Sequence, residues 1–203
     1  MQRLTPMGVM ALALLREGDM HPYEMVRLMR SRRDQRLLAI TNGTLYHTVG
    51  RLQREGLIDE VGIDREGNRP ERTTYTLTDA GTDALVDWLR RELSVVDRPA
   101  EFRIALAEAH NLERAEVIGC LRTRRAALDE GHVAHRDGLV GARAKAVPEQ
   151  VLVEFERQEV LLEAELRWID SLIDRLEAEE FPWGPSAFDY SDRYRAQRKA
   201  AQQ

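Results

Sequence analysis

Apolar residues recur in steps of three and four along two stretches of the carboxyl-terminal half of the chain. The first stretch runs from Ile118 to Leu139 and the second from Leu152 to Leu176, with Pro148 between them. Such spacing draws one narrow apolar seam along a helix, as in coiled coils. The pattern therefore predicts two long helices, joined by a short turn, that pack as an antiparallel pair.

Polar residues occupy some positions of this seam, among them His132, His135 and Glu159. The two histidines lie three residues apart and could bind a metal with His110 or with an acid from another helix. Polar residues in a seam can also specify its register. Because no convincing pair of carboxylates accompanies the histidines, we predict no metal site. Whether His132 and His135 have a metal or pH role stays open.

A second apolar stripe, formed by Leu161, Trp168 and Leu172, lies beside the seam. One chain thus offers more apolar surface than two helices can cover, and a second copy is the natural cover. We therefore predict a homodimer that forms through the helical region. The residues predicted for dimerisation are Ile118, Leu121, Leu128, Leu162, Leu166, Ile169, Ile173 and Leu176.

The amino-terminal half has a different order of elements. Thr5-Pro6 predicts a helix start, since a capping side chain precedes a proline whose missing N–H costs nothing there. A second helix is predicted to begin near His21-Pro22, again with proline in its first turn. Glu17-Gly18 ends the first of these helices. A third helix starts between Thr41 and Thr44 and stops at Gly56.

Two short strands follow, at Leu57-Ile58 and at residues 73–77, with a polar loop from Gly62 to Arg72 between them. Thr78-Asp79 then caps a fourth helix. Three helices followed by a hairpin form a winged helix, in which the third helix can enter a DNA major groove and the hairpin can reach the adjoining backbone.

The predicted fold is mainly α, with an amino-terminal winged helix-turn-helix (α+β) and a carboxyl-terminal antiparallel helical dimerisation domain. We place the winged helix-turn-helix at residues 1–95 and the dimerisation domain at 96–180. Residues 181–203 begin with prolines and glycine and are predicted to be an irregular, mobile tail.

Arginine supplies almost all the positive charge, because Lys145 and Lys199 are the only lysines in a chain of net charge −5. Guanidinium groups bind phosphates and guanine edges better than ammonium groups do, although arginine enrichment can equally follow from genomic base composition. Five arginines gather between Arg27 and Arg36. A polyanionic partner should therefore meet the amino-terminal part.

Several classes of protein are excluded by what the sequence lacks. It has no Gly-x-Ser-x-Gly, Walker loop, dinucleotide fingerprint or His-Glu-x-x-His, so we expect neither an enzyme nor a cofactor. The single cysteine, Cys120, rules out an internal disulfide. The longest apolar stretch, Val9–Leu15, is too short to cross a bilayer, and no signal-peptide cleavage pattern is present. We expect a cytoplasmic protein.

Several motifs in register resemble the PadR family of bacterial transcriptional regulators. They are Thr-Asn-Gly-Thr-Leu-Tyr at 41–46, Arg51-Leu52, Glu-Gly-Leu-Ile at 55–58, Arg69-Pro70, Tyr75, Leu77-Thr78 and Gly81. His-Pro-Tyr-Glu at 21–24 is similar to the family's His-Gly-Tyr-Glu. The sequence departs from the family at Pro22, where glycine is usual, and at His47, where proline is usual. The resemblance covers about residues 5–90.

This resemblance implies a homodimer that binds a near-palindromic operator in double-stranded DNA, commonly as a repressor released by a small aromatic or cationic effector. An activator of the same fold, or a helical protein-interaction module without DNA binding, are the alternatives. The predicted DNA contacts are Thr41, Asn42, Thr44, Tyr46, His47 and Arg51 on the third helix, and Arg69 and Arg72 on the hairpin. Tyr23, Trp88 and Trp168 are the candidates for lining an effector cavity.

Overall fold

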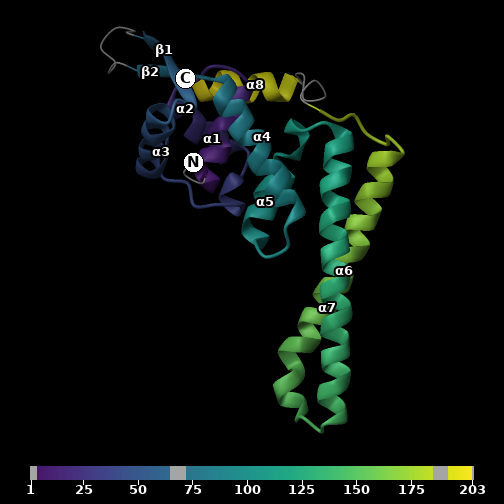
Figure 1. Cartoon of the computed structure of the whole chain (residues 1–203). Helices are drawn as coiled ribbons and strands as arrows, with labels where there is room; N and C mark the ends of the chain where they lie inside the picture. Colours follow the sequence, from purple (N-terminus) through teal and green to yellow (C-terminus); the bar gives the residue numbers. More distant parts are fainter. Residues whose placement is uncertain (1–3, 65–71, 185–191, 203) are drawn as a thin grey trace.

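A computed structural model describes residues 4–64, 72–184 and 192–202. Two long helices, α6 and α7, form an arm that projects from a compact body made of the other elements (Figure 1). The body contains the winged helix that the order of elements predicted. It comprises α1 (Pro6–Arg16), α2 (Pro22–Ser31), the 3-10 turn η1 (Asp34–Arg36), α3 (Asn42–Arg54), β1 (Ile58–Asp64), β2 (Arg72–Leu77) and α4 (Asp79–Ser94).

Each of the first three helices starts at a capping side chain, and the sequence predicted the first of these caps. The hydroxyl of Thr5 accepts from the backbone N–H of Gly8 at 3.2 Å, and His21 Nδ1 accepts from that of Tyr23 at 3.0 Å. Thr41 caps α3 in the same way. These bonds satisfy N–H groups that have no partner inside the helix, and so they fix the helix starts.

The core of the body surrounds α1, which is buried on all sides from Met7 to Leu15. The inner faces of α3 and α4 pack into this core, led by Leu45, Leu52 and Trp88. Gly81 in the first turn of α4 lets that helix approach the strands, because a Cβ at this position would collide with the backbone oxygen of Leu57. Only glycine allows this approach.

Strands β1 and β2 pair antiparallel, with Ile58 opposite Leu77 and an irregularity in register between Glu60 and Gly62. The strands are longer than the sequence predicted, since residues 62–64 and Arg72 belong to the ladder. The predicted loop over Gly62–Arg72 was therefore too long. Its tip, residues 65–71, lies outside the described residues.

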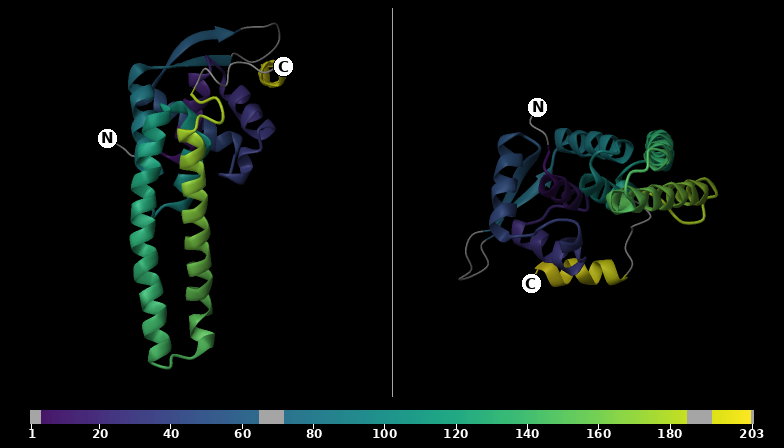
Figure 2. Two further views of the ribbon diagram at one scale, coloured as in Figure 1. Left: turned by 90° about the vertical axis from the view of Figure 1, so that its right-hand side faces the viewer. Right: turned by 90° about the horizontal axis from the view of Figure 1, so that it is seen from below.

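The arm confirms the predicted antiparallel helix pair. After α5 (Pro99–Ala107) and the 3-10 turn η2 (Ala109–Asn111), α6 (Arg114–Ala144) runs outward and α7 (Glu149–Glu177) returns beside it (Figure 2). The buried positions of the predicted seam are Leu121, Leu128, Leu139, Leu152, Leu166, Ile169, Ile173 and Leu176. Val117 and Arg124 on α6 are buried as well, beside the seam. Ion pairs such as Arg125–Asp170 connect the two helices along their edges.

The prediction of an irregular tail was wrong for residues 192–202, which form helix α8 (Asp192–Gln202). The helix lies against α2, as Figure 2 shows in its right-hand view. Ala201 is buried there, and Arg198 donates to the backbone oxygen of Asp19 at 3.3 Å. A polar helix of this kind gains its stability from packing on a neighbour, and α2 supplies that neighbour.

Within the described ranges, no helix is both long enough and apolar enough to traverse a bilayer.

Candidate nucleic-acid interface

The amino-terminal half of α3 is exposed on one face and buried on the other. Leu45, Val49 and Leu52 anchor the helix in the core. The exposed side carries five of the six predicted contacts on this helix: Thr41, Asn42, Thr44, Tyr46 and His47. The start of a helix also presents unpaired N–H groups and a partial positive charge. The structure thus gathers donors and polar edges where an anionic ligand can approach.

The two threonines at the start of α3 hold each other in place. Thr41 Oγ1 accepts from the backbone N–H of Thr44 at 3.1 Å, and its own proton goes to Thr44 Oγ1 at 2.7 Å. Since a hydroxyl has one proton and two lone pairs, Thr44 keeps its proton for another acceptor. A phosphate oxygen can take this role.

Asn42 is linked to a residue that the sequence placed in the arginine cluster and not at the site. Arg30 on α2 donates from Nη2 to Asn42 Oδ1 at 3.3 Å. Arg30 is exposed, so its guanidinium adds a positive charge beside the start of α3. The link was missed because the residues lie twelve positions apart, and only the packing of α2 on α3 brings them together.

The side chains of Tyr46 and His47 are both exposed. Tyr46 is 47% exposed, and its ring meets the ring of His21 edge-on, with centroids 6.2 Å apart. This contact with the cap residue of α2 steadies the tyrosine without burying it. Its hydroxyl and ring edge remain available to a ligand.

Arg51 differs from the other predicted contacts. Its Nη2 donates to Thr5 Oγ1 at 2.8 Å, Nε lies 3.9 Å from Glu55 Oε1, and the side chain is 24% exposed. The guanidinium therefore ties α3 to the cap of α1. A contact between Arg51 and DNA stays a prediction, and it requires the bond to Thr5 to be released or shared.

The hairpin is coupled to α3 at its base, where Gln53 Nε2 donates to Glu60 Oε1 at 2.8 Å. Of the two arginines predicted on the hairpin, Arg69 lies outside the described residues, and Arg72 is described only in its backbone, paired with Asp64. Their roles stay predictions.

The arginine cluster does not act as one surface. Arg32 forms a bidentate ion pair with Glu17, with Nη1 2.7 Å from Oε1 and Nη2 2.9 Å from Oε2. Arg27 lies over the ring of Tyr23, 5.7 Å from its centroid, beside a hollow between α2 and α8 with a volume of about 670 Å³. The hollow is lined by Arg27, Arg30, Ser31, Ala196, Gln197, Ala200 and Ala201.

The three aromatic residues predicted for an effector cavity lie in different environments. Trp88 on α4 is enclosed in the core, 1% exposed. Tyr23 on α2 and Trp168 on α7 are both exposed. Trp88 thus has a packing role, and a role of any of the three in effector binding stays a prediction.

The residues predicted for dimerisation lie on α6 and α7, and most of them are buried within one chain. Ile118 and Leu162 are partly buried, and the other six are buried. Contact of these residues with a second chain stays a prediction. The large apolar side chains that remain exposed on the arm are Val133, Val140, Val151, Val153, Phe155, Val160, Leu161 and Trp168.

Residues 11–87 match the family described as the transcriptional regulator PadR-like family. A search of curated proteins found no match.

Solved structures of similar chains cover most of this one. PadR of Bacillus subtilis in complex with operator DNA is 19% identical and has a TM-score of 0.40, over 83% of this chain and 98% of that one. The protein smu.1604c from Streptococcus mutans is 20% identical with a TM-score of 0.38, over 85% and 96%. B. subtilis PadR in complex with p-coumaric acid is 19% identical with a TM-score of 0.38, over 85% and 99%. The match to the family model, over residues 11–87, confirms the resemblance that the motifs indicated.

Proposed function

We propose that this chain is a DNA-binding transcriptional regulator that places α3 in the major groove of duplex DNA. The exposed face of α3 carries the proposal, because Asn42, Thr44, Tyr46 and His47 stand clear of the core at the start of a well-anchored helix. In helix-turn-helix proteins, the amino-terminal residues of the recognition helix contact the base edges in the major groove. Asparagine can bind adenine through two bonds, and hydroxyls bind phosphates.

A second copy is proposed to complete the regulator. The arm leaves an apolar stripe uncovered, in which Val153, Val160, Leu161 and Trp168 follow helical spacing on α7. Such a stripe on a long helix is typical of a surface that packs on another helix. Two copies joined through residues 96–180 would present two α3 helices to half-sites about 34 Å apart, as a near-palindromic operator requires.

Repression relieved by a small effector is the proposed mode of regulation, and activation is the alternative. An effector can shift binding only if it favours one arrangement of the two heads over the other. The hollow between α2 and α8 supports a place for it, since Arg27 and Arg30 line its wall. Guanidinium groups favour an aromatic carboxylate over a cation at this position.

Variants of α3 test the proposal. Asn42→Ala and His47→Ala remove exposed groups, and each should weaken binding to the DNA upstream of the chain's own gene by about 1–3 kcal/mol where the group reads a base. A phosphate contact would instead weaken all sequences alike. Fluorescence anisotropy with labelled DNA measures both, and Arg167→Ala, exposed on α7, is the control.

Unchanged operator affinity in both α3 variants would reject the assigned surface. If the chain were instead a helical protein-interaction module, no DNA fragment would bind in a salt-dependent manner.

A further inference from the structure

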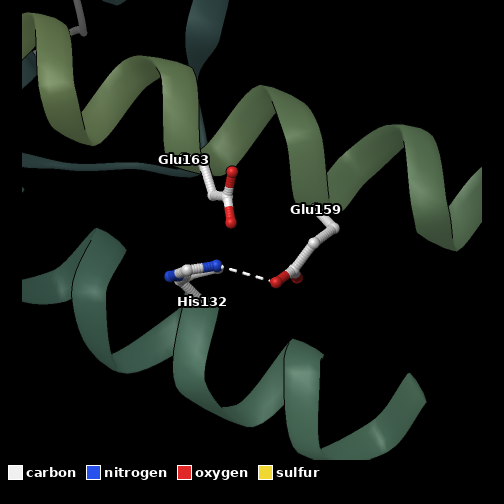
Figure 3. A group of neighbouring side chains, drawn as sticks. All are labelled: His132, Glu159 and Glu163. Atoms are coloured by element: carbon white, nitrogen blue, oxygen red, sulfur yellow. Dashed lines mark hydrogen bonds and ion pairs between the residues drawn. The ribbon is translucent and has the colours of Figure 1, made fainter. Parts of the chain in front are cut away.

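Three side chains that can ligate a metal converge between the helices of the arm. His132 projects from α6, and Glu159 and Glu163 project from α7 toward it (Figure 3). Each offers one ligand atom, and these atoms all lie within 4.8 Å of one another. His132 Nε2 lies 2.9 Å from Glu159 Oε1. The sequence alone showed no pair of carboxylates for this histidine, and the antiparallel register of the arm supplies one.

The helical repeat explains why these residues meet. Glu159 and Glu163 are four residues apart and therefore share one face of α7. Glu159 and His132 occupy seam positions of their helices, so each points toward the other helix. The arrangement depends on the packing of α6 on α7 and not on a mobile loop.

The three side chains differ in how far they are exposed to solvent. His132 is 13% exposed and Glu159 is 18% exposed, whereas Glu163 is 47% exposed. His132 and Glu159 are packed between α6 and α7, and Glu163 lies at the edge of this contact. A cation can therefore enter from solvent past Glu163 and meet two ligands that are already in place.

One oxygen of the cluster is buried and unpaired. Glu159 Oε1 takes the contact with His132, but Glu159 Oε2 is shielded from solvent and has no hydrogen-bond partner among the described residues. An unpaired oxygen of a carboxylate in such a place is costly. Glu163 pairs with Arg167, which lies 3.5 Å away and is largely exposed, and such a surface pair contributes little. The cluster thus holds two carboxylates with one imidazole between them.

We propose that His132, Glu159 and Glu163 bind a divalent transition-metal ion of the Zn²⁺ type. An imidazole nitrogen and two carboxylate oxygens form a donor set that Zn²⁺ accepts, with bonds of about 2.0–2.2 Å. Three protein ligands leave a position for water. The imidazole disfavours Ca²⁺ and Mg²⁺, which take oxygen ligands. Small rotations of the side chains bring the three atoms to a common ion, and binding replaces the proton shared by His132 and Glu159.

The ion would cross-link α6 and α7 part-way along the arm. Because the site exists only when the helices are paired, binding stabilises the folded chain in proportion to the logarithm of the metal concentration. This site is separate from the surface proposed for DNA, so its presence or absence does not decide the proposed function.

Titration of the full chain with Zn²⁺ tests the proposal, after metal has been removed with a chelator. Calorimetry should show one ion bound per chain. Glu163→Gln should weaken this binding tenfold or more, while the contact between His132 and Glu159 and the circular dichroism spectrum stay as they are. Glu154→Gln, which changes an exposed glutamate of α7 outside the cluster, is the matched control and should bind as the unaltered chain does.

Co²⁺ gives a second readout on the unaltered chain, because its visible absorption reports nitrogen and oxygen ligation in a low-symmetry site. His132→Gln should abolish this absorption, and His135→Gln should retain it. The proposal is overturned if the unaltered chain takes up no Zn²⁺ at millimolar concentration. It is also overturned if Glu163→Gln and His132→Gln bind with unchanged affinity, which would mean an adventitious ion elsewhere.

Discussion

Arg124 on α6 donates to one oxygen of Glu165 on α7 from both Nε and Nη2, at 3.1 and 2.7 Å. The same guanidinium donates to the backbone oxygen of Val95, in the connection between α4 and α5. It also lies 3.6 Å from the ring centroid of Phe102 on α5. With 2% of its side chain exposed, Arg124 joins the arm to the body through buried, charge-assisted contacts.

Arg124→Ala should lower the free energy of unfolding by about 2–5 kcal/mol. The substitution leaves a buried carbonyl and a carboxylate without their donor, and it opens a cavity beside Phe102. Urea denaturation of the full chain measures the change. Arg125→Ala is the control, because Arg125 pairs with Asp170 at the surface and such pairs contribute about 0–1 kcal/mol. Equal losses for the two variants would contradict the role given to Arg124.

Glu108, at the end of α5, makes stability depend on pH. Burial, together with the neighbouring carboxylates Glu17 and Asp34, raises the pKa of Glu108 from 4.5 to about 7. The folded chain therefore keeps a proton that the unfolded chain releases. By linkage, the contribution of this group to the free energy of unfolding falls as pH rises from about 4.5 to about 7.

His110 acts in the opposite sense, because burial lowers the pKa of this imidazole from 6.5. Its contribution to stability is lost as pH falls below about 6.5. The substitution Glu108→Gln separates the pH dependence due to Glu108 from that due to His110, because a glutamine side chain stays neutral at every pH. Relative to the unaltered chain, this variant should become more stable as pH rises from 5 to about 7, and the gain should level off above that, in urea titrations. Glu130→Gln, exposed on α6, is the control, and a difference that is constant with pH would contradict the assignment.

Arg198 secures α8 on α2. Its Nε lies 3.4 Å from Oε1 of Glu24, which is buried and whose pKa is raised by burial. Arg198→Ala should lower the free energy of unfolding by about 1–3 kcal/mol, because it removes a cation from beside a buried carboxylate. Limited proteolysis should also cut α8 sooner. Lys199→Ala, exposed on the same helix, should change neither result, and equal behaviour of the two variants would exclude Arg198 as the anchor.

Local signals predicted most of the fold. Thr5 and Thr78 cap their helices as the sequence predicted, and His21 and Thr41 cap two helices whose starts the sequence placed near them. These signals work because a capping side chain and the helix it starts are adjacent in sequence. The seam of the arm was equally visible, since a repeat of three and four residues persists over many turns.

Contacts between distant residues were not predictable in the same way. The composition of residues 181–203 suggested a loose tail, but α8 gains its stability from the surface of α2, which no local signal reveals. Arg51 has the residue type of a DNA contact, yet Thr5 lies within its reach. The closeness of Glu163 to His132 depends on the register of two helices, and the spacing in either helix alone does not determine it.

The most direct test of the central claim is the salt dependence of DNA binding by the full chain. Fluorescence anisotropy would use a labelled fragment from upstream of the chain's own gene, at about 50 mM and about 200 mM salt. Binding through several phosphates predicts tight, sequence-dependent binding that weakens by roughly a hundredfold or more over this range, as counterions are released. No binding at either concentration, or an affinity indifferent to both salt and sequence, would contradict a regulator that reads DNA through α3.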